Sequence, residues 1–461
     1  MAATRLAILG GGPAGYLAAI RAAQLGAAVT LIEERELGGV CLNRGCIPSK
    51  ALLRSAEVRG LILRSAEFGV PAETKAPDWQ TVFSRKERIV KGLRLGVEHL
   101  MIKNRIAVVR GRGRLLDSRR IEVSGPDGTT LVTADRIIIA TGSRPAVPPI
   151  PGAELPGVMT TDEALELEAS PRSAVIIGAG AVGAEFATFF NAMGVNVTVV
   201  EMANQMLPGT DSDIAAEVLK SLKRRGVTVK LGSKVLRLDR GDNGIKVTAE
   251  GAEGAVEAVG DIVLLAAGRR LRSDEAGIPE LGITCRQGAI SVDDHLQTSV
   301  EGVYAAGDVI GGQLLAHVAF AEGRTAAENA LGRARPMDYS AVPACIYSSP
   351  EVATVGLSES VAAAQGREVR VGRFDFRANG KALGLGERDG FVKILVDPRD
   401  GRVLGGHIVG PDATDLISEL SLAVRLGAPA EALAELIHPH PTLSEAVMEA
   451  AADAIGRAIH K

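Results

Sequence analysis

Two cysteines, Cys41 and Cys46, lie five positions apart in the segment GGVCLNRGCIPSK and could form a redox-active disulfide. In an ideal helix, Cα atoms five residues apart are separated by about 8 to 9 Å, beyond the ~7 Å limit for a disulfide. A bridge therefore needs distorted backbone, which Gly45 and Pro48 can supply. A disulfide closing a short strained loop should be easily reduced. The alternatives are two buried thiols or a static crosslink, and a zinc site would lack a second ligand pair.

A glycine-rich pattern, GxGxxG, occurs twice, each time after an apolar run and before an alanine-containing segment that favours a helix. The first glycine permits a tight turn, the second lets the backbone approach a pyrophosphate, and the third lets helix and strand pack closely. The phosphates then bind at the helix N-terminus. One copy alone could serve only packing, but two copies predict two dinucleotide sites. The glycines are Gly10, Gly12 and Gly15, and Gly178, Gly180 and Gly183.

An acidic residue follows each turn at the same offset. Glu33 comes 23 positions after Gly10, and Glu201 comes 23 positions after Gly178. A carboxylate there can accept hydrogen bonds from a ribose diol. We expect FAD in one site and a nicotinamide cofactor in the other. Glu201 would repel a 2′-phosphate, and no arginine follows it in EMANQMLPG, so the expected nicotinamide cofactor is NAD.

The elements that must hold these residues can be predicted from the apolar patterns. Short apolar runs flank each glycine-rich turn and its helix, which indicates strand, turn, helix, strand. Later apolar runs at 134–142, 259–268 and 302–308 should complete the two sheets. Residues 77–104 carry apolar side chains at mostly three- and four-residue steps, which predicts a long helix.

The sequence therefore predicts an α/β fold with two Rossmann-like dinucleotide-binding domains followed by an α+β module. The proline-rich segment SRPAVPPIPG at 143–152 predicts a linker, because consecutive prolines favour extended chain and break strand pairing. From about residue 341, alternating strand patterns are followed by helical segments, which indicates the α+β module.

Composition excludes several classes of protein. The chain has 461 residues, and its 52 Lys and Arg against 55 Asp and Glu give a formal net charge of −3. This balance argues against a disordered chain or a nucleic-acid binder. The longest apolar runs last about half a dozen residues, far short of the ~18 of a membrane span, and the amino end leaves no room for a secretion signal. We expect a cytoplasmic protein with no metal site and no membrane partner.

Four features together resemble the dihydrolipoamide dehydrogenase family of class I pyridine nucleotide-disulfide oxidoreductases. They are GGVCLNRGCIPSKALL, the two glycine-rich turns, AAGD at 305–308 and HPHPTLSE near the C-terminus. The resemblance spans essentially the whole chain. It implies an FAD-binding domain at 1–146, an NAD-binding domain at 147–271, a returning FAD or central part at 272–340 and a C-terminal dimerisation domain at 341–461.

The resemblance also implies roles for single residues. Glu33 would bind the adenosine ribose of FAD, and Asp308 its ribityl chain. Cys46 would lie beside the flavin, and Cys41 would exchange with substrate. Further cofactor contacts are expected at Thr141, Gly142, Gly268 and Arg269.

Lys50 would lie near flavin N5, paired with Glu185. A fixed cation stabilises a reduced, anionic flavin, and a neighbouring carboxylate keeps that cation ionised in a buried site. From spacing alone, both residues could equally be ordinary surface charges.

His440 would act as a base, since Glu445 can fix its tautomer through one imidazole nitrogen. A histidine held in a proline-rich turn is the alternative, and we expect His317 and His438 to be structural or near the site. In the family the base and the cysteines meet across a two-fold dimer. The resemblance therefore implies a homodimer whose active sites are shared between subunits.

The implied reaction oxidises protein-bound dihydrolipoamide to lipoamide with reduction of NAD⁺ to NADH. The implied partners are lipoyl domains of a 2-oxoacid dehydrogenase or glycine cleavage complex. The alternatives are a related NAD(P)H-dependent reductase of another disulfide, and a redox-sensing flavoprotein subunit without turnover. Three departures from the family pattern, at Val40, Arg44 and Leu271, affect the expected substrate preference and flavin tuning.

Overall fold

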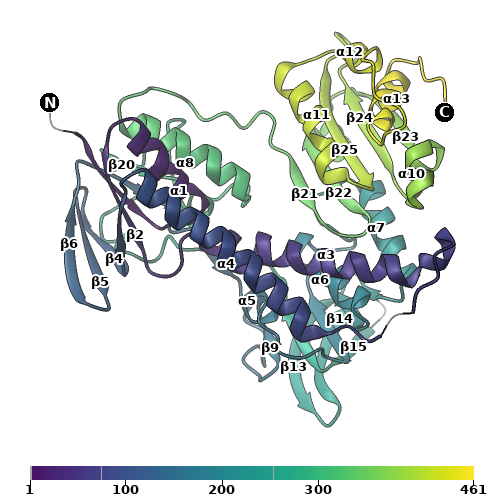
Figure 1. Ribbon diagram of the computed structural model, residues 1–461, viewed down its shortest axis with the longest axis horizontal. Helices are drawn as coiled ribbons and strands as arrows, with labels where there is room; N and C mark the ends of the chain where they lie inside the picture. The colour runs from purple at the N-terminus through teal and green to yellow at the C-terminus, as the bar shows by residue number, and fades with distance from the viewer. Residues whose placement is uncertain (1–2, 74, 253) are drawn as a thin grey trace.

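The computed structural model describes residues 3–73, 75–252 and 254–461. Two parallel five-stranded sheets each carry one glycine-rich turn, and a third five-stranded sheet lies in the C-terminal part (Figure 1). The expected α/β class, with two Rossmann-like units and a C-terminal α+β domain, is therefore confirmed. The domain boundaries stay predictions, and residues 1–2, 74 and 253 within them lie outside the described part.

The first sheet and its helices are built from two distant parts of the chain. They comprise β1 (Arg5–Leu9), α1 (Pro13–Gln24), β2 (Ala28–Glu33), β3 (Ala107–Arg110), β7 (Arg136–Ile139), β20 (Val303–Ala305) and α8 (Ala316–Ala330). The strand order is β20-β7-β1-β2-β3, with every neighbouring pair parallel. The chain therefore returns to this sheet after it has built the second one, and α8 packs against α1.

The second sheet has the order β12-β11-β10-β16-β9, again with parallel neighbours. Its elements are β9 (Val158–Met159), α5 (Thr161–Ala164), β10 (Ser173–Ile177), α6 (Ala181–Ala192), β11 (Asn196–Val200), α7 (Ser212–Arg224), β12 (Thr228–Lys230) and β16 (Ile262–Leu265). Three phenylalanines of α6 are buried in the core beside this sheet: Phe186, Phe189 and Phe190.

Three of the described α-helices lie between β2 and β3 in the chain, and the two longer ones cross the middle of Figure 1. They are α2 (Gly39–Arg44), α3 (Cys46–Leu63) and α4 (Trp79–Lys103). The helix predicted at 77–104 is thus present as α4. Its first residue, Trp79, stacks on Phe83 and donates from Nε1 to the Leu167 carbonyl at 2.9 Å, which fixes α4 to the second unit. α3 packs against both α4 and α6.

Several antiparallel strands lie outside the sequence prediction. Two three-stranded meanders consist of β4 (Arg112–Asp117), β5 (Arg120–Gly125) and β6 (Gly128–Thr133), and of β13 (Lys234–Gly241), β14 (Gly244–Gly251) and β15 (Gly254–Gly260).

The proline-rich linker is not wholly unpaired, which corrects the prediction. β8 (Ser143–Pro145) pairs with β17 (Arg269–Leu271), because a proline carbonyl still accepts hydrogen bonds and this two-stranded ribbon has open edges.

The C-terminal domain has an antiparallel sheet in the order β21-β22-β25-β24-β23. Its strands are β21 (Ala344–Ile346), β22 (Glu351–Gly356), β23 (Arg370–Asp375), β24 (Phe391–Val396) and β25 (Val403–Gly410). Its helices are α9 (Glu359–Ala364), α10 (Gly380–Leu385), α11 (Ala413–Leu426), α12 (Ala430–Ala434) and α13 (Glu445–Ala454). α11 and α13 pack on the sheet. Among the described helices, none is both long and apolar enough to cross a membrane.

Candidate active site

The two cysteines lie on either side of a break between two helices. α2 ends at Arg44, Gly45 adopts φ −149° and ψ −110°, and α3 begins at Cys46. This is the kind of backbone distortion that a bridge between Cys41 and Cys46 requires. In the structure both are half-buried free thiols that interact with each other.

The pKa values of these two thiols move in opposite directions. A hydrogen bond from the Cys41 thiol lowers the pKa of Cys46 to about 7, and the charge of Lys50 also lowers it, against the effect of burial. The hydrogen bond to Cys46 and burial raise the pKa of Cys41. In this pair of thiols, negative charge is therefore more stable on Cys46 than on Cys41. Burial raises the pKa of Cys345 to about 11, so that thiol stays protonated at neutral pH.

Lys50 lies one turn after Cys46 on α3 and forms an ion pair with Glu185 on α6. Its Nζ lies 2.9 Å from both carboxylate oxygens, and Glu185 is only 8% exposed. Glu185 follows Gly183 by two positions, so the helix that starts at the second glycine-rich turn also carries this carboxylate. The pair joins the two nucleotide-binding units and is not two separate surface charges.

The two glycine-rich turns have the same backbone geometry. Gly10 and Gly178 have φ values of 107° and 108°, in the region that favours glycine. A Cβ at Gly10 would lie 2.2 Å from the Ala140 oxygen. A Cβ at Gly178 would lie 2.4 Å from the Ala266 oxygen. The first glycine of each turn is therefore required by the protein itself.

The second glycine of each turn faces open space. Among the described atoms, a Cβ at Gly12 would meet nothing closer than 3.8 Å, and a Cβ at Gly180 nothing within 4 Å. These glycines directly precede α1 and α6, whose N-termini lack a side-chain cap. Free N–H groups beside an open approach fit a dinucleotide pyrophosphate at both turns.

The acids after the turns also occupy equivalent positions. Glu33 accepts a hydrogen bond from the Gly11 backbone N–H at 2.6 Å. Glu201 accepts one from the Ala179 backbone N–H, also at 2.6 Å. Each carboxylate is thereby held at the edge of its turn and keeps lone pairs for the two hydroxyls of a ribose.

Asp308 follows β20 at the carboxyl end of the first sheet. Ser143 donates a hydrogen bond to its carboxylate. Arg269 Nε donates to Ser143 Oγ at 2.6 Å and lies 3.7 Å from Asp308 Oδ2. The structure therefore brings Arg269 to Asp308 on the first unit.

The remaining predicted cofactor residues lie where the chain crosses between the two units. Gly142 and Gly268 have φ values of 71° and 106°. Thr141 Oγ1 donates to the Arg272 carbonyl at 3.2 Å. Their roles as cofactor ligands stay predictions.

His440 and Glu445 contact each other at the start of α13. His440 Nδ1 lies 2.8 Å from Glu445 Oε1, and the imidazole is 79% exposed. Burial raises the pKa of Glu445, but hydrogen bonds from the Thr442 backbone and from His440 outweigh it and lower that pKa. The ionised carboxylate favours a proton on Nδ1, which leaves Nε2 as an exposed acceptor.

The other two histidines named from the sequence are held by the protein. His438 Nδ1 lies 2.9 Å from the Leu436 carbonyl, and its Nε2 lies 3.0 Å from Glu419. His317 Nε2 lies 2.7 Å from the Pro343 carbonyl.

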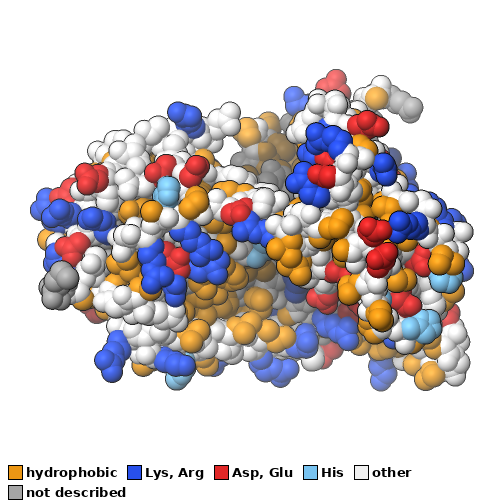
Figure 2. Space-filling view, turned by 90° about the horizontal axis from the view of Figure 1, so that it is seen from above, with side chains coloured by type: hydrophobic (Ala, Val, Ile, Leu, Met, Phe, Trp, Pro, Cys, Tyr) orange, Lys and Arg blue, Asp and Glu red, His pale blue; other side chains and the backbone are white. Residues whose placement is uncertain are grey.

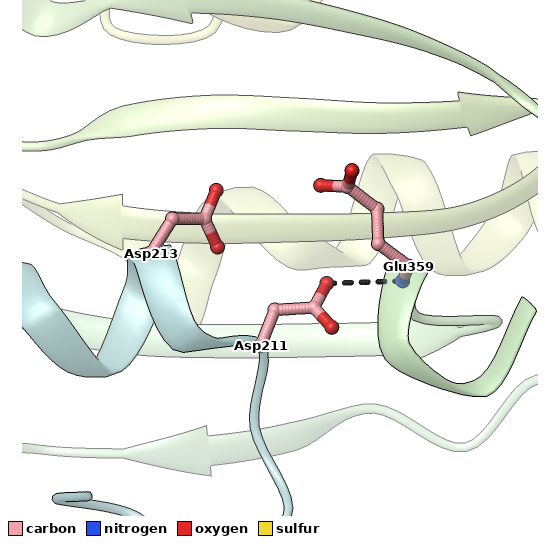
Figure 3. Close-up of side chains that lie close together, drawn as sticks. All are labelled: Asp211, Asp213 and Glu359. Carbon is pink, nitrogen blue, oxygen red and sulfur yellow. Dashed lines mark hydrogen bonds between the residues drawn. The ribbon is translucent and has the colours of Figure 1, made fainter. Parts of the chain in front are cut away.

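Within the described residues, one group of acids has the spacing of a metal site: Asp211, Asp213 and Glu359 (Figure 3). Asp211 and Asp213 lie at the start of α7, and Glu359 begins α9 of the C-terminal domain. The buried ammonium of Lys393 lies 2.9, 2.8 and 2.7 Å from these three carboxylates in that order. Lys393 supplies the cation, so this group joins two domains rather than holding a metal.

Two residues that contact the site were missed by the sequence analysis. The Tyr347 backbone N–H donates a hydrogen bond to Glu185 Oε1 at 3.0 Å. The Lys50 Nζ lies 4.5 Å from the centroid of the Tyr347 ring. No sequence signal could identify Tyr347, because it is 162 positions from Glu185. Ser143 was detectable, since it directly follows the predicted contacts Thr141 and Gly142.

Two of the three departures from the family pattern have a structural role. Arg44 forms an ion pair with Glu36 at 2.8 Å, and its Nε lies 4.0 Å from Asp162 of α5. Leu271 pairs with Ser143 in the β8-β17 ribbon. Nothing in the structure explains valine at position 40.

Comparison with protein families settles the class of the molecule. Residues 4–323 match the family described as pyridine nucleotide-disulphide oxidoreductase, and residues 342–451 match the dimerisation domain of that family. The chain belongs to this family. The resemblance to its dihydrolipoamide dehydrogenases is confirmed, and the pyridine nucleotide-disulphide oxidoreductase uses FAD and NAD.

Curated relatives of this pyridine nucleotide-disulphide oxidoreductase are similar over nearly its full length. The dihydrolipoyl dehydrogenase of Bacillus subtilis is 44% identical, covering 98% of each chain. That of Geobacillus stearothermophilus is 41% identical, covering 99% of this chain and 97% of the relative.

Two solved structures share the fold. LpdA from Mycobacterium tuberculosis is 32% identical with a TM-score of 0.90, covering 97% of this chain and 99% of LpdA. The Cu(II) complex of the HOCl-induced flavoprotein disulfide reductase RclA from Escherichia coli is 28% identical with a TM-score of 0.88, covering 98% and 99% of the two chains.

Proposed function

We propose that this oxidoreductase is a dihydrolipoyl dehydrogenase that oxidises protein-bound dihydrolipoamide to lipoamide and reduces NAD⁺ to NADH. One observation carries the proposal. The Cys41 and Cys46 pair lies beside the Lys50–Glu185 ion pair, which joins the two dinucleotide-binding units. Full-length relatives that are 40 to 44% identical and named dihydrolipoyl dehydrogenase support the choice of substrate.

The cofactors follow from the two turns. FAD, when bound, supplies two-electron chemistry that connects dithiol oxidation to nicotinamide reduction. We assign FAD to the first turn, with contacts at Gly10, Gly12, Gly15, Glu33, Lys50, Thr141, Gly142 and Asp308. We assign NAD to the second turn, with contacts at Gly178, Gly180, Gly183, Glu185, Glu201 and Gly268. We assign Arg269 to the FAD site, because it contacts Ser143 and lies near Asp308.

The thiol chemistry starts from a Cys41–Cys46 disulfide. A substrate thiolate attacks the Cys41 sulfur, the bond between the two cysteine sulfurs breaks, and Cys46 leaves as thiolate. The second substrate sulfur then attacks the first, which closes the lipoamide disulfide and releases Cys41, which takes up a proton. The substrate is thereby oxidised by two electrons, and the cysteine pair is reduced by two.

The pKa of Cys46 suits its role as the leaving sulfur. A thiolate with a pKa of about 7 is a better leaving group than one of ordinary pKa. Lys50 stabilises the negative charge that remains on it after the exchange.

The base of this scheme is His440, which accepts the substrate thiol proton at Nε2 while Glu445 holds Nδ1. We assign this histidine to the cysteines of the partner subunit. The highly exposed imidazole supports that assignment, as does a set of exposed apolar side chains in the C-terminal domain that a partner subunit could cover: Leu422, Leu426, Leu436, Ile437 and Ile459. Figure 2 shows hydrophobic side chains on the surface of the right-hand part, where the C-terminal domain lies.

The macromolecular partners are the lipoyl domains of a 2-oxoacid dehydrogenase or glycine cleavage complex. We place the enzyme in the cytoplasm, since a catalytic dithiol suits a reducing compartment.

A substrate comparison tests the proposal. The holoenzyme should reduce NAD⁺ with dihydrolipoamide and should use NADP⁺ poorly, because Glu201 repels a 2′-phosphate. Turnover of another disulfide with NADPH but none of dihydrolipoamide with NAD⁺ would favour the second candidate, a related disulfide reductase. The likeness to RclA supports that candidate.

A further inference from the structure

Tyr347 belongs to the C-terminal domain but contacts an ion pair formed by the other two domains. It lies between β21 and β22. Its backbone N–H donates to Glu185 Oε1 at 3.0 Å, and the Nζ of Lys50 lies 4.5 Å from its ring centroid. One residue therefore contacts both members of the pair.

The neighbouring backbone fixes Tyr347 in place. The Ser349 carbonyl accepts a hydrogen bond from the Ser221 hydroxyl of α7 at 2.8 Å. The Ser349 hydroxyl accepts one from the Arg225 guanidinium at 2.5 Å. Ser348 is 5% exposed and donates to the Pro350 carbonyl at 2.6 Å. These contacts hold the backbone beside Tyr347, and the Tyr347 side chain itself hydrogen-bonds to Thr414.

The Lys50 ammonium, whose side chain is 32% exposed, contacts two groups that attract a cation. The Glu185 carboxylate lies 2.9 Å away, and the face of an aromatic ring attracts a cation within about 6 Å. The peptide N–H of Tyr347 also donates a hydrogen bond to the Glu185 carboxylate. Burial raises the pKa of Tyr347, so the ring acts as a neutral group.

We propose that Tyr347 is a positioning residue of the redox site, whose ring holds the Lys50 ammonium against Glu185 and so stabilises the Cys46 thiolate. This inference rests on the proposed function, which makes Cys46 the leaving sulfur. It adds the C-terminal domain to the groups that set the charge at the cysteines.

The charged and titratable groups around Cys46 come from several elements. Cys41 faces it from α2, Lys50 from α3 and Glu185 from α6. Cys345 of β21 also faces Lys50 but is protonated at neutral pH. Lys50 is thus the cation whose displacement would raise the pKa of Cys46.

Two substitutions separate the ring from the hydroxyl. Tyr347→Leu removes the aromatic face and keeps the backbone N–H, whereas Tyr347→Phe keeps the ring and removes the hydroxyl. The readout is the long-wavelength absorbance of the Cys46 thiolate against FAD in the two-electron-reduced holoenzyme, titrated with pH. The leucine variant should raise the midpoint by about half a pH unit, and the phenylalanine variant should stay within about 0.1 unit of the wild type.

The result that overturns the inference is a leucine variant that titrates like the wild type, or a phenylalanine variant that shifts equally. Tyr347→Met provides a second non-aromatic side chain of similar reach, with FAD content and thermal midpoint measured in parallel. The proposed function fails in a different way: the wild-type enzyme itself would show no thiolate absorbance after reduction by dihydrolipoamide.

Discussion

Cys41 and Cys46 have the same side chain, but their pKa values shift in opposite directions because their surroundings differ. Cys46 begins α3 and feels the charge of Lys50 one turn later, whereas burial and the shared proton keep Cys41 neutral in the reduced pair. In the proposed mechanism, the substrate thiolate therefore attacks the Cys41 sulfur and the negative charge collects on Cys46. The assignment depends on residues that the sequence places within ten positions of each other.

Replacing Cys46 by serine should abolish NAD⁺ reduction by dihydrolipoamide, because a serine oxygen can neither form nor open the bridge. The drop in kcat should be at least about 10³-fold, with FAD content unchanged. The matched control is Cys345→Ser, whose thiol has a pKa of about 11 and takes no part in the exchange. Anaerobic steady-state assays measure both variants, and full turnover of the Cys46 variant would remove the disulfide from the mechanism.

At the scale of secondary structure, the two glycine-rich turns show which glycines serve the fold and which serve a ligand. A Cβ at Gly183 would lie 2.0 Å from the Gly178 oxygen, whereas a Cβ at Gly180 meets no described atom within 4 Å. The third glycine is thus needed for α6 to pack against β10. The second is needed only if something outside the protein approaches it.

Gly183→Ala should destabilise the protein by about 1–3 kcal/mol, because α6 must shift away from the strand. Gly180→Ala should leave the thermal midpoint nearly unchanged and weaken NAD binding by about tenfold or more, since the methyl group meets the pyrophosphate. Thermal unfolding and NADH titration of the same two holoenzymes measure both effects. Equal loss of stability in both variants would contradict this division of roles.

The strands and helices around the turns were predictable because each carries its own signal. The strand predicted before the first glycine-rich turn is present as β1, Arg5–Leu9. The α4 helix has the predicted 3.6-residue apolar period. The meanders were missed, although the alternation of Ile245, Val247 and Ala249, each at most 1% exposed, was a detectable strand signal. The β8–β17 ribbon was not predictable, because it pairs segments about 125 residues apart that share no sequence pattern.

The contacts between distant domains were the least predictable part of the site. Lys50 and Glu185 could be named only by resemblance, and Tyr347 not at all, because tertiary packing brings them together. The same holds for the Lys393 cluster, whose acids are 148 positions apart. Short-range sequence patterns identify the cysteines and the glycine-rich turns of the site. They do not identify the distant residues that alter the pKa values or positions of the site's side chains.

For the whole molecule, the Lys393 cluster should be a main connection between the second unit and the C-terminal domain. Lys393→Met leaves Asp211, Asp213 and Glu359 without their cation and should cost about 3–5 kcal/mol of unfolding free energy. Lys220→Met, at an exposed ion pair with Glu217, should cost less than about 1 kcal/mol. Chemical denaturation measures both.

The pH dependence of the unfolding free energy lost in Lys393→Met follows from the pKa of Asp211. Burial raises its pKa, but hydrogen bonds from Lys393 and from two backbone N–H groups outweigh it and lower the pKa below 3.8. Because the pKa of Asp211 is lower in the folded protein than in the unfolded chain, its ionised carboxylate stabilises the fold at pH values above the unfolded-state pKa. This stabilisation is lost as the pH falls through the folded-state pKa. The difference between Lys393→Met and the wild type should therefore narrow below about pH 4. A constant difference would contradict the ionic origin of the connection.

The proposed sharing of active sites between subunits makes a prediction for mixed dimers. Cys46→Ser and His440→Ala subunits should each be inactive alone. In a hybrid dimer, one site receives both defects and the other receives none. Random assembly of equal amounts should therefore restore about a quarter of wild-type activity. Sedimentation should show dimers of the 47.9 kDa chain, and a mixture no more active than its parents would place each site within one subunit.

The central claim is that the Cys41–Cys46 bond opens and closes once in each turnover. Peptide mapping after anaerobic alkylation tests it directly in the holoenzyme. The oxidised enzyme should yield the two cysteines as one disulfide-linked peptide, dihydrolipoamide should convert both to alkylated thiols, and NAD⁺ should then restore the link. Two separately alkylated cysteines in every state, with turnover intact, would contradict the account.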